Sequence, residues 1–322
     1  MNILITSAGR RVSLVKAFKT ELTKLISNSK VFTVDLEPEL SAACHVSDKS
    51  FTVPKVNDPN YIKSLLFLCA ENNIKLIIPT IDTELLILSK NKNKFLEKGV
   101  VVVVSSIDFV KKCRDKYSIH DFFAKNNIPV AKEYKRDNYK LPLFLKPYDG
   151  SRSIDTYIIK KEEDLNSKHF ENKKLMFLEY LNLKAYDEYT CDLYYDKNNH
   201  LKCVVPRKRI ETRDGEVSKG MTEKNIIIEF LKERLSHIEG AIGCLTVQVF
   251  KNKLNNKIIG IEINPRFGGG FPLTYLAGAN YVKWILEEYL FDEKIDENFD
   301  CWQNNLLMLR YDNEILINDF RN

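Results

Sequence analysis

The spacing of apolar and polar residues divides the first hundred positions into short strands that alternate with amphipathic helices. Four apolar, β-branched runs predict strands, at 2–6, 31–35, 76–79 and 100–105. Three segments with apolar residues at helical spacing lie between them, at 12–26, 61–72 and 83–94. Strands without polar alternation suit a sheet that is buried on both faces, and the strand–helix order predicts a parallel α/β sheet.

The pattern changes near residue 106, where we expect a domain boundary. Two polar helical periods come first, and then short strands joined by polar turns, at 143–146, 156–160, 176–180 and 189–194. The remaining predicted elements are a long helix, two strands, a second helix and a last strand, at about 223–240, 245–250, 257–263, 282–290 and 306–311. Hairpins of this kind indicate antiparallel sheet, so we expect an α+β fold here.

Composition and charge then disfavour several classes of partner and cellular location. Lysine plus arginine number 49 and aspartate plus glutamate 44, and the net charge of +5 is spread along the sequence. Without a basic block, nucleic acid is not the expected partner. The first residues lack the order of a signal peptide, and no apolar stretch approaches the ~20 residues of a membrane helix, so we expect a cytoplasmic protein. Seven scattered cysteines without a Cys-x-x-Cys pair predict buried thiols.

The sharpest chemical signal is a strand that ends in polar residues and continues into Asn-Pro-Arg and three glycines. Glu262 and Asn264 alternate with isoleucines and therefore share one face, and Gln248 on the preceding strand can lie beside them. Such oxygens suit Mg²⁺ when water and phosphate complete its shell. Arg266 is a fork donor for phosphate oxygens. The alternative is a polar strand face followed by a flexible loop.

A second signal is a lysine at the end of a predicted strand, just before a small-residue turn. Lys146 is placed to meet a phosphate as a point charge, and Gly150, Ser151 and Ser153 can supply amides and hydroxyls. A solvated hairpin tip is the alternative. The turn is not a Walker loop, because the sequence contains no G-x-x-x-x-G-K-[ST].

Three further segments leave structural and functional interpretations open. The backbone of Glu179, Tyr180 and Leu181 and the carboxylate of Glu188 can hold an adenine edge and a ribose, or they are two ordinary strands. The run 206–220 is typical of a solvated face, yet its Arg207, Arg209 and Lys219 are candidate anion contacts. Near the N-terminus, Arg10 or Arg11 can meet a carboxylate after a structural βα turn, and Asp82 and Glu84 are helix caps or amine contacts.

These pieces occur in one order that resembles the ATP-grasp superfamily, specifically its carbamoyl-phosphate-synthetase-like branch, which includes the lysine ligase of pyrrolysine biosynthesis. The segments that carry the resemblance are Asp115-Lys116, Leu145-Lys146-Pro147, Glu179-Tyr180-Leu181, Glu188-Tyr189-Thr190, Gln248 and Glu262-Ile263-Asn264-Pro265-Arg266. The resemblance implies a Rossmann-like pre-ATP-grasp domain over 1–105 and a two-lobed ATP-grasp fold. The small lobe with the phosphate loop is expected over 106–178, and the large lobe with the metal site and C-terminal tail over 179–322.

The same resemblance implies a role for each matching residue. Lys116 and Lys146 would contact the ATP phosphates, the backbone of 179–181 would hold adenine, and Glu188 would hold the ribose. Glu262 would bridge two Mg²⁺ ions, with Mn²⁺ as an alternative, with Gln248 on one and Asn264 on the other. Arg266 would steady the transferred phosphoryl group, with Arg207 and Lys219 as further catalytic candidates. Gln248 departs from the acid of many members, and the loop after Gly150 has fewer glycines than usual.

The implied reaction is an ADP-forming carbon–nitrogen ligation, in which a carboxylate becomes an acyl phosphate and an amine displaces phosphate. The substrates would be a small carboxylic acid and an amine, and a homodimer is the commonest arrangement for a soluble enzyme. A non-catalytic Mg-ATP-binding protein is the alternative. A nicotinamide oxidoreductase is disfavoured, because only Gly9 of a G-x-G-x-x-G pattern is present after the first strand.

Overall fold

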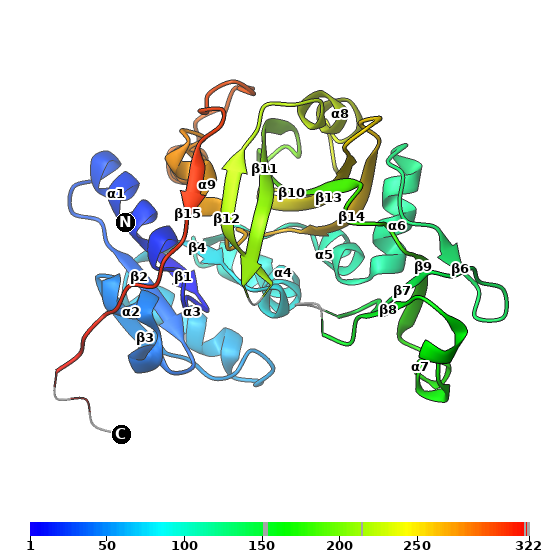
Figure 1. The fold of residues 1–322 in the computed structure, drawn as a ribbon. Helices are drawn as coiled ribbons and strands as arrows, with labels where there is room; N and C mark the ends of the chain where they lie inside the picture. The colour runs from blue at the N-terminus through cyan, green and yellow to red at the C-terminus, as the bar shows by residue number, and fades with distance from the viewer. Residues whose placement is uncertain (151–153, 214, 319, 321–322) are drawn as a thin grey trace.

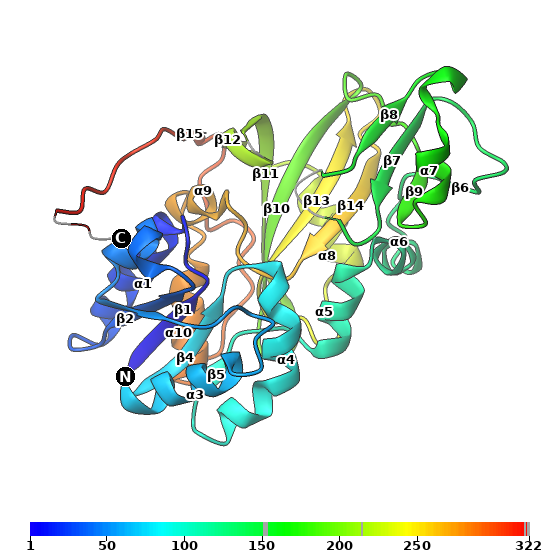
Figure 2. The same ribbon diagram turned by 90° about the horizontal axis from the view of Figure 1, so that it is seen from below.

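The computed structural model describes residues 1–150, 154–213, 215–318 and 320 of the 322-residue chain. Its strands form three separate sheets, and helices lie between and around them (Figures 1 and 2). Among the described residues, none of the helices has both the length and the hydropathy to cross a lipid bilayer.

The N-terminal sheet has five parallel strands in the order β3-β2-β1-β4-β5. Its strands are β1 (Asn2–Thr6), β2 (Val31–Asp35), β3 (Lys49–Thr52), β4 (Ile74–Pro79) and β5 (Val101–Val102). The helical segments around it are α1 (Val12–Leu25), a 3₁₀ turn (Pro38–Leu40), α2 (Ala42–Val46), α3 (Tyr61–Glu71) and α4 (Asp82–Leu96). Strands β1 and β4 are almost wholly buried, as predicted for a sheet covered on both faces.

Two helices lead from this sheet to a small antiparallel one. They are α5 (Ile107–Arg114) and α6 (Lys116–Lys125), and the side chain of Asp115 caps α6 by accepting from Tyr117 N–H at 2.9 Å. The small sheet has the order β6-β9-β7-β8. Its elements are β6 (Glu133–Tyr134), β7 (Leu143–Pro147), β8 (Tyr157–Ile159), a 3₁₀ turn (Glu162–Asp164), α7 (Ser167–Glu171) and β9 (Leu175–Glu179).

The third sheet is the largest and is antiparallel, with the order β14-β13-β10-β11-β12-β15. Its strands are β10 (Tyr186–Tyr195), β11 (Leu201–Arg213), β12 (Glu216–Thr222), β13 (Gly243–Asn252), β14 (Ile258–Asn264) and β15 (Leu307–Leu309). Three helices accompany it, namely α8 (Ile227–Arg234), α9 (Phe271–Leu276) and α10 (Tyr281–Leu290). The predicted combination of a parallel α/β part and an antiparallel α+β part is therefore confirmed.

One apolar core joins the N-terminal sheet to the large sheet. Helix α1 packs against α9 and α10, and the ring of Phe18 meets that of Phe267 edge-on at 6.0 Å between centroids. The hydroxyl of Tyr275 donates to Glu21 across the same contact at 2.7 Å. Because Phe267 follows the Asn-Pro-Arg segment directly, this packing holds the N-terminal domain over the end of β14 (Figure 2).

Two predicted elements differ from the structure. The helix expected over about 223–240 is only α8, because the chain turns at Leu235 and His237 then forms a β-bridge with His200. The charged run 206–220, interpreted as a solvated face, forms the end of β11 and most of β12 and includes the buried Arg207, while Asp214 lies outside the described residues. The domain limits at 105 and 178 stay a prediction.

Candidate active site

Two adjoining cavities lie along the large sheet. The first, of about 460 Å³, lies between the large and the small sheet, and the second, of about 700 Å³, lies between the large sheet and the N-terminal domain. The residues that line both are Lys116, Gly150, Ile154, Arg209, Gly215, Gln248 and Glu262. A ligand in one cavity can therefore reach a ligand in the other at this shared wall.

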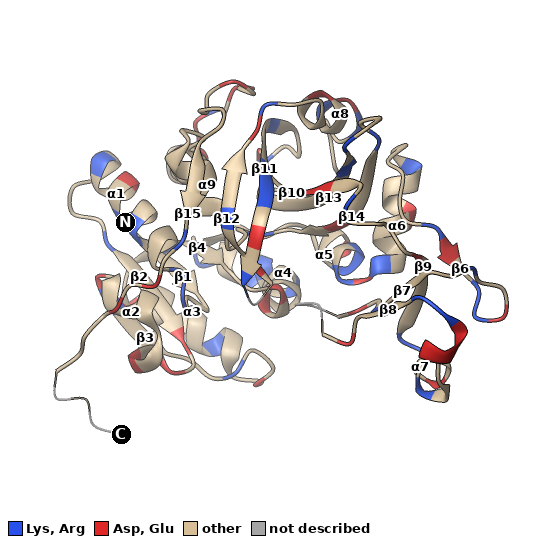
Figure 3. Ribbon diagram, in the orientation of Figure 1, with Lys and Arg blue, Asp and Glu red and all other residues tan. Residues whose placement is uncertain are grey.

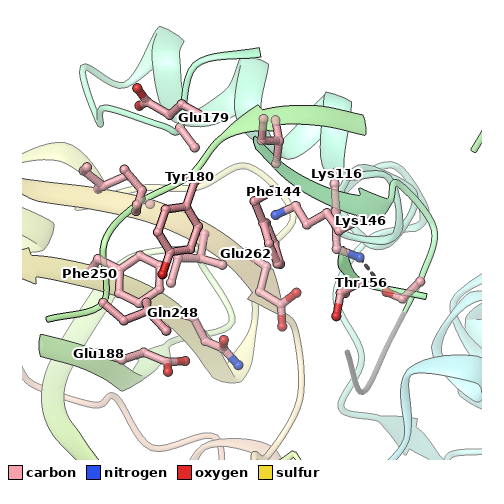
Figure 4. Close-up of a pocket in the computed structure, with 18 of the residues that line it drawn as sticks. Lys116, Phe144, Lys146, Thr156, Glu179, Tyr180, Glu188, Gln248, Phe250 and Glu262 are labelled. Atoms are coloured by element: carbon pink, nitrogen blue, oxygen red, sulfur yellow. Dashed lines mark hydrogen bonds between the residues drawn. The ribbon is translucent and has the colours of Figure 1, made fainter. Parts of the chain in front are cut away.

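The predicted metal ligands meet at the shared wall. Gln248 and Glu262 are register partners on β13 and β14, and both point into the first cavity (Figure 4). The side-chain amide of Asn264 donates to Glu262 Oε1 at 2.9 Å, so the two residues share one strand face as predicted. Within the described parts of the chain, no group of three or more His, Cys, Asp or Glu is placed to hold a metal ion.

This donor set fits Mg²⁺ only together with a ligand that brings more oxygens. One carboxylate and two amide oxygens carry a single negative charge, whereas Mg²⁺ prefers six oxygens and keeps waters or phosphates in its shell. The cavities leave room beside Glu262 for such a ligand. The residues present therefore fit a metal that arrives with a polyphosphate, and they do not fit a permanent structural ion.

Two lysines face this wall from the other side. Lys146 lies next to the last residue of β7 and is 8 % exposed, and its ammonium group has no hydrogen-bond or ion-pair partner among the described residues. Burial lowers the pKa of its ammonium group to about 8, an effect that Glu262 opposes and Lys116 reinforces. Lys116 begins α6 and its ammonium group donates to the carbonyl of Gly150, and burial also lowers its pKa. Because neither ammonium group is paired with a carboxylate, the two lysines form a site for anionic phosphates.

The turn after Lys146 is described only in part. The amide of Gly150 donates to the carbonyl of Pro147 at 3.3 Å, which closes the turn. Ser151 and Ser153, which were predicted to contact phosphate, lie outside the described residues. Thr156, on the far side of the turn, also lines the first cavity (Figure 4).

The far end of the first cavity is an apolar slot. Phe144 on β7 and Phe250 on β13 line it, and the ring of Tyr180 lies beside Phe250 (Figure 4). Glu179 is anchored to the segment before β6, because its amide donates to Lys132 O at 2.8 Å and its carboxylate accepts from Lys132 N–H at 3.0 Å. Leu181 follows, and among the described residues its amide has no backbone partner. The slot therefore suits a flat, mostly apolar ring with hydrogen-bonding edges.

Glu188 lies between the slot and the shared wall. It forms an ion pair with Arg209 of β11 at 3.2 Å. Burial raises the pKa of Glu188, and the charge of Arg209 opposes that rise. Arg209 lines both cavities, and its Nε is buried without an acceptor among the described residues.

One residue of this cavity was not anticipated from the sequence. His120 lies one helical turn after Lys116 on α6, is buried, and lines the same cavity. Its Nδ1 has no partner within the described chain, and burial, aided by the charges of Lys146 and Lys116, lowers its pKa to about 4. The only available signal was its spacing of four from Lys116, which places both side chains on one helix face.

The three residues predicted to be catalytic occupy different environments. Arg266 lines the second cavity and pairs with Asp82 at the start of α4, at 2.5 Å between Nη2 and Oδ2. Arg207 is 1 % exposed and forms a two-pronged pair with Asp192 at 2.8 and 3.0 Å. Lys219 lies in an exposed ion pair with Glu211 and lines neither cavity, so its position gives no support to a catalytic role.

The candidate residues of the N-terminal domain also occupy different environments. Glu84 is fully buried and accepts from the amides of Thr80 and Ile81 at 2.7 and 3.2 Å, so it caps α4. Gly9, with a φ of +47°, donates to Asp35 at 2.8 Å and forms the structural βα turn that was expected. Arg10 and Arg11 follow that turn and line the second cavity.

Comparisons with known proteins agree with this arrangement. A family model described as "PylC-like, N-terminal domain" matches residues 3–103, and one described as "ATP-grasp in the biosynthetic pathway with Ter operon" matches residues 171–304. By sequence, no curated protein matches the chain.

Three solved structures illustrate the similarity of fold. The biotin carboxylase domain of the 2-oxoglutarate carboxylase of Hydrogenobacter thermophilus, in complex with MgADP, ADP and bicarbonate, has a TM-score of 0.72 at 14% identity, over 94% of this chain and 72% of that one. N5-carboxyaminoimidazole synthetase from Staphylococcus aureus has a TM-score of 0.69 at 18% identity, over 91% and 78%. The L-amino acid ligase from Bacillus licheniformis has a TM-score of 0.65 at 16% identity, over 90% and 74%.

The matched residues and the fold define the class: residues 171–304 match an ATP-grasp family, and the chain has the fold of the ATP-grasp structures above. More particularly, the match over residues 3–103 is to the PylC-like N-terminal domain, and the match over residues 171–304 is to the ATP-grasp family described for a biosynthetic pathway with the Ter operon. The resemblance inferred from the order of the sequence motifs is thereby confirmed.

Proposed function

We propose that the protein is an ADP-forming carbon–nitrogen ligase that activates a small carboxylic acid with ATP and joins it to an amine. The observation that carries the proposal is the shared wall of the two cavities. Glu262, Gln248 and Lys116 line both cavities, so a phosphate chain that ends there can meet a second molecule. A binding protein for a nucleotide alone has no need of the second, larger cavity.

The first cavity suits ATP along its whole length. The apolar slot between Phe144 and Phe250 would take the adenine, and the unpaired amide of Leu181 would donate to the edge of the ring. Glu188 would accept from the ribose hydroxyls. Lys146 and Lys116 would neutralise the phosphates, which explains why both ammonium groups are kept without carboxylate partners.

Magnesium would be held by Glu262, with Gln248 and Asn264 as amide ligands. The Asn264 amide now donates to Glu262, so its carbonyl oxygen is the atom left for a metal or for water. When bound, Mg²⁺ would neutralise the charge that gathers on the phosphate oxygens. That two ions would bind is what the resemblance implies.

The chemistry then needs positioning and charge rather than a protein nucleophile. A carboxylate oxygen of the acid forms a bond to the γ-phosphorus while the bond from that phosphorus to ADP breaks. The amine next forms a bond to the acyl carbon, phosphate leaves with the electron pair, and the amine loses a proton. Arg266 lies where the second cavity begins beyond Asn264, and its fork would steady the transferred group.

The structure suggests different roles for the other two catalytic candidates. Arg207 is committed to Asp192, which also accepts from the hydroxyl of Thr274 at 2.5 Å, so we propose that it supports the wall of the second cavity. Lys219 is left out of the proposed mechanism because it lies in an exposed pair away from both cavities.

A direct test is an assay of nucleotide products. The protein is incubated with Mg-ATP and a pool of amino acids and small carboxylic acids, and ADP, AMP, phosphate and pyrophosphate are separated. The proposal predicts ADP and phosphate that depend on the pool. Release of AMP and pyrophosphate, or of no nucleotide product with any pool, would contradict it.

A second candidate function has one observation in its favour. Glu262 is the single carboxylate among the three predicted metal ligands, which would suit a protein that binds Mg-ATP without turning it over. Calorimetry separates the two functions: tight binding of Mg-ATP that stays intact with every substrate pool supports the binding protein.

A further inference from the structure

The second cavity has an excess of cations at the end that faces the N-terminal domain. Arg10 and Arg11 from the β1–α1 turn and Arg266 from the turn after β14 lie there with the carboxylates of Asp82 and Glu216, and the other described acidic residues that line the cavity are Asp149 and Glu262. Figure 3 shows acidic and basic residues spread over the rest of the molecule. The question at this end of the cavity is which of the arginines are paired with a carboxylate.

Both carboxylates at this end are already engaged by other arginines. Asp82 pairs with Arg266 at 2.5 Å, and Glu216 pairs with Arg310, just after β15, at 3.0 Å. Neither forms an ion pair with Arg11 in the described parts of the chain. Each carboxylate therefore contacts another arginine directly, and although the charges of both also act on Arg11, neither is in ion-pair contact with it among the described residues.

The side chain of Arg11 makes few polar contacts within the protein. Among the described residues, its only side-chain hydrogen bond is from Nη2 to the carbonyl of Thr80, at the long distance of 3.5 Å, and the side chain does not cap α1. Burial first, and then the charge of Arg266, lowers the pKa of Arg11, while the charges of Glu216 and Asp82 oppose that fall. A half-buried guanidinium group with four unused N–H donors is costly unless an anion meets it.

A buried donor next to Arg11 points the same way. The Nε of Arg266 is shielded from solvent and has no acceptor among the described residues, although Nη1 and Nη2 of the same side chain are bonded. Buried donors are normally satisfied, so an acceptor is expected from a bound molecule. The two arginines are close enough for the charge of Arg266 to lower the pKa of Arg11.

We propose that Arg11 is a specificity-determining residue that binds a carboxylate group which does not itself react. The proposal rests on the proposed function in that the second cavity is taken as the substrate cavity. The carboxylate belongs either to the amine substrate, which is then an amino acid, or to a second acid group on the substrate that is phosphorylated. In both cases the N-terminal domain selects the substrate by charge, while the large sheet performs the reaction.

The test compares carboxylates with their amides. Wild-type protein, with the Mg²⁺ complex of a non-hydrolysable ATP analogue, is titrated calorimetrically with amino acids and their α-amides, and with dicarboxylic acids and their monoamides. We expect members of one series to bind about tenfold to a hundredfold more tightly than their amides, as a charged hydrogen-bonded pair requires. The series that shows the difference identifies which substrate carries the carboxylate.

Two variants then assign the effect to Arg11. Arg11→Ala should remove the preference for the carboxylate, and Arg11→Lys should keep part of it. Lys16→Ala removes one positive charge from the exposed side of the same helix, outside both cavities, and should leave the preference unchanged. Affinity for the ATP analogue should be the same in all four proteins.

Three results would overturn the inference. They are a full preference for carboxylates in Arg11→Ala, equal losses in Arg11→Ala and Lys16→Ala, and the absence of any difference between carboxylates and amides in wild-type protein. Failure of the proposed function is a separate result, because it appears as AMP formation or as no turnover in the product assay. The binding preference is measured without turnover.

Discussion

The two cavities are built in different ways, although they share a wall. The first is an apolar slot with isolated charges, and its lining comes mostly from neighbouring strands of two antiparallel sheets, with Lys116 and His120 from α6. The second is rich in arginine, and its lining comes from the N-terminal domain, the end of α5, the strands β11 and β12, and the turn after β14. Local sequence patterns can therefore predict a cavity that suits a common nucleotide. A cavity that selects one particular substrate depends on how distant parts of the chain pack together, which local patterns do not show.

The two cavities also differ in whether their buried charges are neutralised within the protein. In the first cavity, Lys146 and Lys116 are kept short of counter-charge, so a ligand must supply it. Beside the second cavity, Arg207 is already neutralised by Asp192 within the protein. We therefore expect changes in the first cavity to affect binding and turnover, and a change at the Arg207 pair to affect stability.

The largest expected effect on turnover is at the shared wall. Glu262→Gln should lower ADP release about a thousandfold, because metal-assisted charge stabilisation contributes several kcal/mol. The measurement is single-turnover ADP formation at saturating Mg-ATP. The matched control is Glu179→Gln at the far end of the same cavity, where the amide oxygen can still accept from Lys132 N–H. Equal activity in Glu262→Gln and wild-type protein would remove the shared wall from the mechanism.

The next effect is on stability and concerns the pair beside the second cavity. Asp192→Asn should lower the free energy of unfolding by about 3–5 kcal/mol, because it leaves the fully buried Arg207 without a counter-charge. Urea unfolding measures the change, and Glu211→Gln, which breaks an exposed pair, is the control. Unchanged stability combined with lost turnover would instead make Arg207 catalytic.

The affinity for ATP should depend on pH through Lys146. Its folded-state pKa of about 8 means that the ammonium group is charged below pH 8 and loses its proton above it. Only the charged form attracts phosphate, so the affinity for the Mg-ATP analogue should fall between about pH 8 and 9.5, by at most about tenfold per pH unit. Lys146→Met should bind about tenfold to a hundredfold more weakly at pH 7 and show no such slope. A slope that persists in Lys146→Met would assign the titration to another group.

The smallest effect is expected outside both cavities. Lys219→Ala should change ADP release very little and the free energy of unfolding by less than about 0.5 kcal/mol, since exposed ion pairs contribute little. Steady-state kinetics and urea unfolding together check this. A loss of turnover as large as that of Glu262→Gln would restore the catalytic role that the sequence suggested for Lys219.

Most of the fold could be predicted because its signals are local. The strands β1, β2, β4, β7 and β14 are apolar or alternating runs, and α1 and α10 show clear helical spacing. The long helix over 223–240 was wrong, since its apolar spacing continues past Leu235 while Gly240, with a φ of +78°, turns the chain towards Ser106. Tertiary contacts overrode the local pattern at that point.

The residues of the candidate site show the same difference between local signals and long-range packing. Glu262, Asn264 and Gln248 were found because strand alternation fixes the face of each side chain. The pairing of Arg207 with Asp192, and of Arg266 with Asp82, could not be found, because each partner is brought close only by sheet register or by domain packing. His120 was missed because its spacing of four from Lys116 indicates a shared helix face but does not show that the face lines a cavity.

The central claim is that a carboxylate in the second cavity attacks a phosphoryl group held at the shared wall. The most direct measurement uses an acid substrate from the product assay, labelled with ¹⁸O in its carboxyl group, followed by mass spectrometry of the released phosphate. An acyl phosphate passes one carboxyl oxygen to phosphate, so the account predicts phosphate that carries one ¹⁸O atom for each molecule of ADP. Phosphate without the label, formed together with the condensed product, would contradict it.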